Sequence, residues 1–111
     1  MQEEAPYVNT SLNGLAKKYY ENGKLQHEVF FVNNKMNGML REYFEISGNL
    51  KSQTIFADNV PNGLAKEYYE SGKLKRETPF VGGVENGVQK EYDENGKVKA
   101  ETRYVNGMKS D

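Results

Sequence analysis

Asn-Gly pairs recur along the whole chain at nearly constant spacing, and this repeat restricts the fold more than any other feature. The pairs begin at residues 13, 37, 62, 86 and 106, so their spacings are 24, 25, 24 and 20. A second series of glycines, each preceded by Asn or Ser, lies between them at residues 23, 48, 72 and 96. Such a chain is expected to be an array of similar units that each lean on their neighbours, not one globular core.

Each unit has the pattern of a β-hairpin. An apolar residue follows the first Gly, Tyr follows four residues later, and the unit closes on an aromatic residue. Residues after the second Gly alternate with a period of two, which predicts a half-buried strand with Leu25, His27, Val29 and Phe31 on one face. Glu-Asn-Gly-Lys and Glu-Ser-Gly-Lys, between two such runs, predict hairpin turns because Gly supplies a positive φ.

Short linkers rich in turn-forming residues join one unit to the next. We therefore predict an all-β fold, an elongated antiparallel meander of four successive hairpins, because a single hairpin is marginally stable in water. Residues 1–12 are expected to be a leader or an N-terminal cap. Residues 106–111 are either the start of a fifth unit or a C-terminal cap, and the four predicted units are 13–36, 37–61, 62–85 and 86–105.

Two registers satisfy the charges within each hairpin. A two-residue loop would pair Lys17 with Glu28, Lys66 with Glu77 and Lys90 with Glu101. A three-residue loop with a Gly bulge would pair Tyr19 with Leu25, Tyr68 with Leu74, Glu67 with Lys75 and Glu91 with Lys99. We favour the bulged version because it aligns the two apolar positions that occur in every unit.

Charge and composition exclude several classes of function. Lys and Arg number 15 against 16 Asp and Glu, so there is no basic surface of the kind that binds nucleic acid. The chain has no Cys and one His, which excludes Cys-based metal sites and any site that needs two His. No apolar run approaches the roughly 18 residues of a membrane span. We predict no metal and no cofactor.

Tyrosines at the same place in every unit are expected to form the structural core of the repeats. Cross-strand aromatic and aliphatic pairs stabilise stacked hairpins, so leucine or valine from the facing strand should pack with them. The predicted core residues are Tyr19, Tyr43, Tyr68, Tyr92, Leu25, Leu50, Leu74 and Val98.

The aromatic residues that follow these tyrosines form a candidate binding surface. They are Tyr20, Phe44 and Tyr69, and the series ends at Asp93. Neighbours in a strand point to opposite faces, so this row is expected on the outer face, where it could bind a ligand or form a second packed face. The basic series Lys17, Arg41, Lys66 and Lys90, interleaved with Glu42, Glu67 and Glu91, is expected to be a solvated mixed face.

No catalytic set of residues is visible. His27 has no repeated carboxylate partner, so it is a poor candidate for a general base. The recurring acids beside the turns are interpreted as solvated turn flanks, and Asp93-Glu94-Asn95 is only a fragment of a calcium-loop pattern. We therefore predict that the protein is not an enzyme. The turn-flanking acids are Glu21, Glu45, Glu70 and Glu94.

The units resemble MORN repeats, the "membrane occupation and recognition nexus" hairpin motif, and more closely the bacterial variant of that repeat. The resemblance rests on Tyr68-Tyr69-Glu70-Ser71-Gly72-Lys73-Leu74, followed by Glu77, Phe80 and Asn86-Gly87, and covers residues 13–107. It implies an elongated, twisted sheet of successive hairpins. Bacterial proteins of the variant family are often labelled as the antitoxin of a toxin–antitoxin pair, whereas eukaryotic MORN proteins are associated with phosphoinositide lipids and protein scaffolding.

These observations lead to two functional hypotheses. The first is a non-enzymatic repeat scaffold that binds another protein, either a cognate toxin or an envelope protein, with edge-mediated self-association as a further option. The alternative is a surface that binds a glycan or a lipid headgroup at the cell envelope. The polar start Gln2-Glu3-Glu4-Ala5-Pro6 favours an exported or envelope-associated bacterial protein over a cytoplasmic one.

Overall fold

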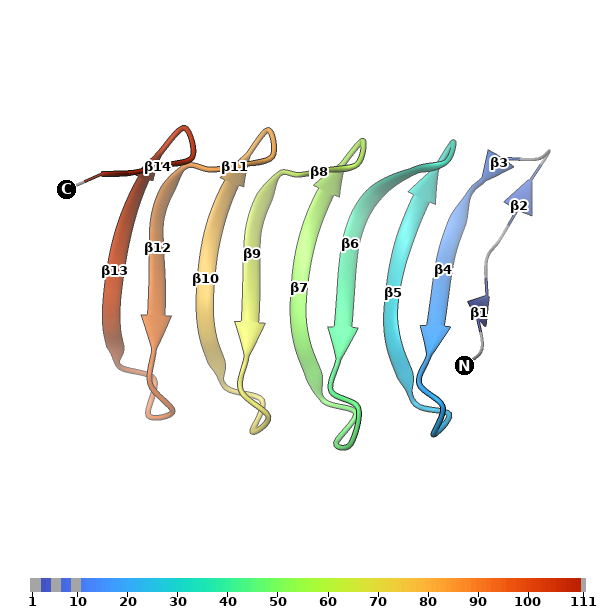
Figure 1. The fold of residues 1–111 in the computed structure, drawn as a ribbon, viewed down its shortest axis with the longest axis horizontal. Coiled ribbons are helices and arrows are strands. Elements are labelled where there is room, and N and C mark those ends of the chain that lie inside the picture. Colours follow the sequence, from blue (N-terminus) through green and yellow to red (C-terminus); the bar gives the residue numbers. More distant parts are fainter. Residues whose placement is uncertain (1–2, 5–6, 9–10, 111) are drawn as a thin grey trace.

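The predicted all-β meander is confirmed. A computed structural model describes residues 3–4, 7–8 and 11–110, and all regular elements in these residues are strands. Eight long strands lie side by side in chain order, each antiparallel to the next (Figure 1). They are β4 (Gly14–Tyr19), β5 (Leu25–Val32), β6 (Lys35–Tyr43), β7 (Leu50–Ala57), β9 (Gly63–Tyr68), β10 (Leu74–Val81), β12 (Gly87–Tyr92) and β13 (Val98–Val105).

Short strands complete the sheet along one edge and at its two ends. Along the edge, β8 (Val60–Pro61) pairs with β7 and β11 (Val84–Glu85) pairs with β10. At the C-terminal end, β14 (Met108–Ser110) pairs with β13. At the other end β1 (Glu3–Glu4) pairs with β4, while β2 (Tyr7–Val8) and β3 (Ser11–Leu12) form a separate two-stranded antiparallel sheet. Residues 1–2, 5–6 and 9–10 of the predicted leader or cap, and residue 111, lie outside the described residues.

The sheet is a single layer without an enclosed core. The molecule measures 48 × 32 × 14 Å, and its thickness is that of one sheet with side chains on both faces. Among the described residues only Val29 and Thr78 are buried, with 5% and 6% of their surface exposed. Stability therefore comes from contacts between neighbouring strands rather than from a central core.

The turns alternate between the two long edges of the sheet (Figure 1). At one edge the N–H of Tyr20 donates to the carbonyl of Lys24 at 2.8 Å, which closes a three-residue loop, and the third and fourth units repeat this arrangement. In the second unit Phe44 N–H bonds to Asn49, so the loop has one more residue. That extra residue accounts for the single spacing of 25.

At the other edge, two-residue turns with positive φ join one hairpin to the next. Both residues of each turn have a positive φ, which is the conformation of a type I′ turn. The turns are Asn33-Asn34, Asp58-Asn59, Gly82-Gly83 and Asn106-Gly107. The first four Asn-Gly pairs lie at corners beside these turns. The Asn62 Oδ1 accepts from the N–H of Gly82 at 3.1 Å, and the carbonyl of Pro61 accepts from Gly83 at 2.8 Å.

This docking of a turn on an Asn-Gly corner recurs in every unit. The corner glycines need a positive φ, and a Cβ at Gly87 would lie 2.8 Å from the Pro79 side chain. The asparagine Oδ1 atoms of residues 13, 37, 62 and 86 accept from the N–H groups of residues 33, 58, 82 and 106 at 2.9, 3.3, 3.1 and 3.4 Å.

The hairpin register combines the two alternatives from the sequence. Tyr68 pairs with Leu74, as predicted for the bulged loop, but Lys66 pairs with Glu77, as predicted for the short one. A β-bulge at Lys75 shifts the register by one residue between these pairs, so the predicted pairing of Glu67 with Lys75 is wrong. Glu91 likewise pairs with Ala100 and not with Lys99. The bulge increases the local twist of each hairpin.

The bulge also corrects the predicted faces. Because directly paired residues point to the same side, Leu25 shares a face with Tyr19, whereas His27, Val29 and Phe31 lie on the opposite face. Simple alternation had placed all four together, and it fails because the bulge at Gln26 adds one residue. The same correction applies to Leu74 in the third unit and Val98 in the fourth.

We name the two faces by residues that each unit contributes to them. The tyrosine face carries Tyr19, Tyr43, Tyr68 and Tyr92 with Leu25, Leu50, Leu74 and Val98. The hollowed face carries the closing aromatic residues Phe31, Phe56, Phe80 and Tyr104.

Candidate functional site

Three junctions join the four hairpins, and their side chains on the hollowed face differ. The first junction lies between β5 and β6, the second between β7 and β9, and the third between β10 and β12. Equivalent positions in each unit contribute the residues that meet there, so the junctions can be compared directly.

Larger side chains fill the first and third junctions. At the first, Val29 pairs with Leu40 and is buried. At the third, Thr78 is buried and its Oγ1 accepts from the Gln89 amide at 2.9 Å. At both junctions, therefore, these side chains cover the backbone on the hollowed face.

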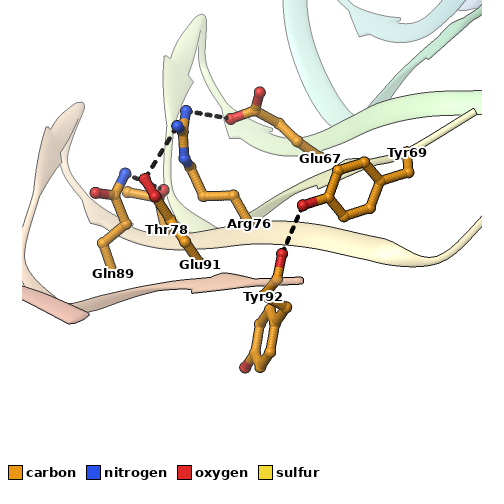
Figure 2. Close-up of polar contacts among 7 residues, drawn as sticks. All are labelled: Glu67, Tyr69, Arg76, Thr78, Gln89, Glu91 and Tyr92. Atoms are coloured by element: carbon orange, nitrogen blue, oxygen red, sulfur yellow. Dashed lines mark hydrogen bonds and ion pairs between the residues drawn. The ribbon is translucent and has the colours of Figure 1, made fainter. Parts of the chain in front are cut away.

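An arginine clamps the third junction. The Arg76 guanidinium lies between Glu67 on one side and Glu91 on the other, with one N–O contact of 3.1 Å to each carboxylate (Figure 2). Burial acts to lower the pKa of Arg76, but the attraction of Glu67 and then of Glu91 outweighs it, so the pKa is raised. Arg76 is thus held as a cation that bridges two units.

The second junction carries the smallest side chains of the three. Ser52 occupies the position of Arg76 and pairs with Glu67, and its Oγ donates to Glu42 at 2.8 Å. Thr54 and Ala65 occupy the positions that Thr78 and Gln89 fill at the third junction. The lack of side-chain volume here leaves the hollowed face open.

The result is an open hollow of about 580 Å³ centred on β7 and β9. Three phenylalanine rings line it, together with three lysines, three glutamates and, near the corner edge, Pro61 of β8. Small polar residues, Ser52 and Thr54, form part of its floor. The phenylalanines and charged residues of the lining are Phe44, Phe56, Phe80, Lys51, Lys66, Lys75, Glu42, Glu67 and Glu85.

Of the three candidate surface aromatics, Phe44 lines this hollow, and the two tyrosines have a structural role. The Tyr69 hydroxyl donates to the carbonyl of Tyr92 at 2.7 Å (Figure 2), and Tyr20 donates to the carbonyl of Tyr43 at 2.7 Å. Each bond ties one unit to the next. Phe44 has no hydroxyl and lines the hollow instead. All three rings are half-buried.

Lysines from the bulge positions lie over these rings. The Lys51 ammonium is 5.9 Å from the centre of the Phe44 ring, and the Lys75 ammonium is 5.7 Å from that of Tyr69. These distances fall within the range of cation–π attraction. The hollow thus offers apolar rings beside charged groups of both signs.

The predicted core tyrosines lie on the opposite face and are half-buried, since one sheet layer does not enclose them. The Tyr43 hydroxyl donates to Glu28 at 3.0 Å and the Tyr92 hydroxyl to Glu77 at 2.7 Å. Burial and then the bond to Glu28 raise the pKa of Tyr43, and the bond to Glu77 and then burial raise that of Tyr92. Leu25, Leu50 and Leu74 are also half-buried, whereas Val98 is exposed.

Sequence reasoning assigned the wrong acids to the basic series. Arg41 and Lys66 lie on the tyrosine face, while Glu42 and Glu67 lie on the hollowed face. The acids that do alternate with the basic residues come from the facing strands, because Glu28 pairs with Arg41 across the first junction. The Arg41–Glu28 N–O distance is 3.6 Å.

In the part of the chain that the structure describes, no three His, Cys, Asp or Glu side chains are grouped to hold a metal ion. The same residues include no helix long and apolar enough to cross a membrane. His27 lies on the hollowed face, paired with Lys18 on one side and Glu42 on the other.

Comparison with known families identifies the repeat. The profile of the family described as "MORN repeat variant" matches residues 12–33, 61–81 and 85–106, more than half of the chain. The chain belongs to this family. No curated protein and no solved structure matches it significantly.

The three matched segments are the first, third and fourth MORN repeat variants, and each has a three-residue loop. The second repeat lies outside the matches and is still the same hairpin in structure. It is also the repeat with the longer loop and with Phe44 and Ser52. The unit that departs from the MORN repeat variant pattern therefore borders the hollow. The family is a repeat module of the non-catalytic, binding kind.

Proposed function

We propose that the protein is a non-enzymatic repeat scaffold that binds a segment of another protein in the hollow over the second junction. The observation that carries the proposal is an open hollow of about 580 Å³ lined by three phenylalanine rings, three lysines and three glutamates, with two of the lysines lying over aromatic rings. Aromatic residues in partly desolvated hollows are typical anchors of protein interfaces.

The lysines favour a protein over a glycan. Sugars stack on exposed aromatic faces, but the Lys51 and Lys75 ammonium groups lie over the rings of Phe44 and Tyr69. A partner segment with an apolar side chain flanked by a carboxylate would satisfy both the rings and the ammonium groups. Such a contact combines burial of apolar surface with charge complementarity.

The test is capture of a partner by the tagged full chain from soluble and envelope fractions, with mass spectrometry to identify it. A captured protein supports the proposal if Lys75→Glu lowers its affinity at least tenfold and Lys97→Glu does not. Lys97 is the matched control, because it is an exposed lysine beside the three-residue loop of the fourth hairpin and the charge change is the same. A captured protein whose affinity both variants leave unchanged contradicts the proposed site.

The partner's identity refines the proposal. A toxin-type protein would match what the resemblance to the bacterial variant implies, and an envelope protein would make the chain a scaffold there. Retention on peptidoglycan or anionic vesicles, with no protein enriched, would instead favour the alternative of a glycan or lipid headgroup. That result would contradict protein binding.

A further inference from the structure

The exposed large hydrophobic side chains of the described residues gather on the tyrosine face. Of the twelve large hydrophobic side chains that are exposed among the described residues, eleven lie on this face, and the exception is Ile46 in a loop. The most exposed on the sheet are Val81 at 55% and Met108 at 74%. One-sided exposure of this extent marks an interaction surface.

These side chains form two bands near the corner edge. One band consists of the apolar residue after each corner Gly and its partner on the facing strand, such as Leu15 with Phe30 and Leu64 with Pro79, and it ends at Val88, whose partner is Arg103. The other consists of residues flanking the two-residue turns, such as Val81 with Val84, and it is interrupted at Lys35, the partner of Val32. The sheet has no second layer to cover them.

The molecule exposes more surface than a compact chain of its mass. Its exposed area is 7022 Å², whereas a compact monomer of 12.7 kDa exposes about 6,200 Å². The excess of about 800 Å², counted over both faces and the edges, is similar in size to what each partner buries in a protein interface of standard size.

Beside the apolar bands runs a row of charges whose sign alternates from strand to strand, except on β7, where the uncharged Gln53 stands. Across the eight long strands it reads Lys17, Glu28, Arg41, Gln53, Lys66, Glu77, Lys90 and Glu101. A row of this kind is complementary to its own reverse. If a second copy is turned about an axis parallel to the strands between β7 and β9, Lys17 faces Glu101, Glu28 faces Lys90 and Arg41 faces Glu77.

We propose that the tyrosine face is a two-fold interface between two copies of this chain, with their sheets packed face to face and their repeats in opposite order. Apolar bands from both copies supply the burial, and the alternating charges set the order and register. Face-to-face sheets pack about 10 Å apart with aligned strands, so the bands reach each other. The hollowed faces remain open on both outer sides, so the proposal is independent of partner binding there.

The first test is the mass of the full chain by sedimentation equilibrium at micromolar concentration. We expect the mass of a dimer, and we expect Ile55→Lys to halve it, because Ile55 is exposed on β7 next to the axis. Thr54→Lys is the matched control, since it adds the same charge on the same strand but on the hollowed face. A monomer for the parent chain, or loss of the dimer in Thr54→Lys alone, would overturn the proposal.

The second test determines whether the repeats of the two copies run in opposite order. Because the chain has no Cys, only the introduced cysteines can react. With a short bifunctional thiol reagent, a mixture of Leu15→Cys and Arg103→Cys chains should be cross-linked, because β4 of one copy faces β13 of the other. Leu15→Cys chains alone should not be. Cross-linking of Leu15→Cys chains to one another would overturn the reversed order even if a dimer forms.

Discussion

The second and third junctions share one backbone pattern and differ in their side chains. Ser52 pairs with Glu67 across the second as Arg76 pairs with Glu91 across the third. Arg76 bridges two carboxylates of different units, while Ser52 bonds only to Glu42 of its own hairpin. The comparison shows that backbone pairing builds the array, and that side chains decide whether a junction is clamped or open.

The same contrast holds for the aromatic row and for the tyrosine face. Tyr69 donates a hydrogen bond into the fourth unit, whereas Phe44 has no hydroxyl with which to reach the carbonyl of Tyr68. Tyr92 bonds to Glu77 across the third junction, where the second junction has Tyr68 and the uncharged Gln53. Each difference removes a link between the two halves of the sheet, so the second junction should be its weakest line.

The largest effect is expected from removal of the arginine clamp. Arg76→Ala should lower the free energy of unfolding by about 1–2 kcal/mol, because two charge-assisted hydrogen bonds are lost and two carboxylates remain near each other. Exposure of about a third of the Arg76 side chain keeps this estimate small. Ser52→Ala is the control and should cost about 0.5 kcal/mol. Urea denaturation measures both, and equal losses would contradict the comparison.

A clamp can also be installed at the open junction. In Ser52→Arg the guanidinium would lie between Glu42 and Glu67, as Arg76 lies between Glu67 and Glu91, and should stabilise the fold by about 0.5–1 kcal/mol. The long side chain would also fill the hollow, so partner affinity should fall while stability rises. Hydrogen exchange at β7 and β9 would report the closure directly. Faster exchange there than in the parent would show that the added arginine does not clamp.

A smaller effect on stability is expected from the hydroxyl that Phe44 lacks and Tyr69 has, with opposite signs when it is added at one position and removed at the other. Phe44→Tyr should raise the free energy of unfolding by about 0.5 kcal/mol, since the new hydroxyl can donate to the carbonyl of Tyr68. Tyr69→Phe should lower it by a similar amount. Thermal or urea unfolding of the two variants measures the effect of one hydrogen bond at each junction. Changes of the same sign in both would refute the equivalence of the two positions.

The smallest effect concerns alkaline pH. The pKa values of Tyr43 and Tyr92 are raised in the folded protein, so each favours folding fully below the unfolded value of about 10. This contribution is lost as the pH rises through the folded pKa. Tyrosine absorbance followed against pH should therefore show two hydroxyl groups that ionise later than the rest. Glu28→Gln should lower the pKa of Tyr43, because the bond to the carboxylate is lost. Titration of all tyrosines together would show that these bonds do not form.

The repeated units were enough to predict the fold, because the signals that define a hairpin are local. Turn glycines, alternation and the pairing of Tyr68 with Leu74 all lie within one unit. The bulge at Lys75 could not be predicted from charge, because each of the two possible registers pairs oppositely charged residues. The sequence did hold a weaker signal of the bulge. Where two registers are both favourable in one hairpin, each can form in part of the hairpin if one residue is bulged out between them.

The site depended on contacts between units, which a unit-by-unit alignment hides. The position occupied by His27, Ser52, Arg76 and Ala100 varies in every copy and therefore carried no pattern, yet this variation separates the clamp from the hollow. The apolar band was missed for a related reason. Leu15 and Leu64 repeat faithfully and so resemble core positions, but one layer of sheet leaves them uncovered.

The corner asparagines determine where such a chain can change its length. Each two-residue turn docks on the Asn-Gly corner that opens its own unit, so an inserted residue there would break two hydrogen bonds, such as those of Gly82 and Gly83. The opposite loops are not tied to a corner, and the second one already holds an additional residue. Small insertions should therefore accumulate at that edge, while growth of the array proceeds by duplication or loss of whole units.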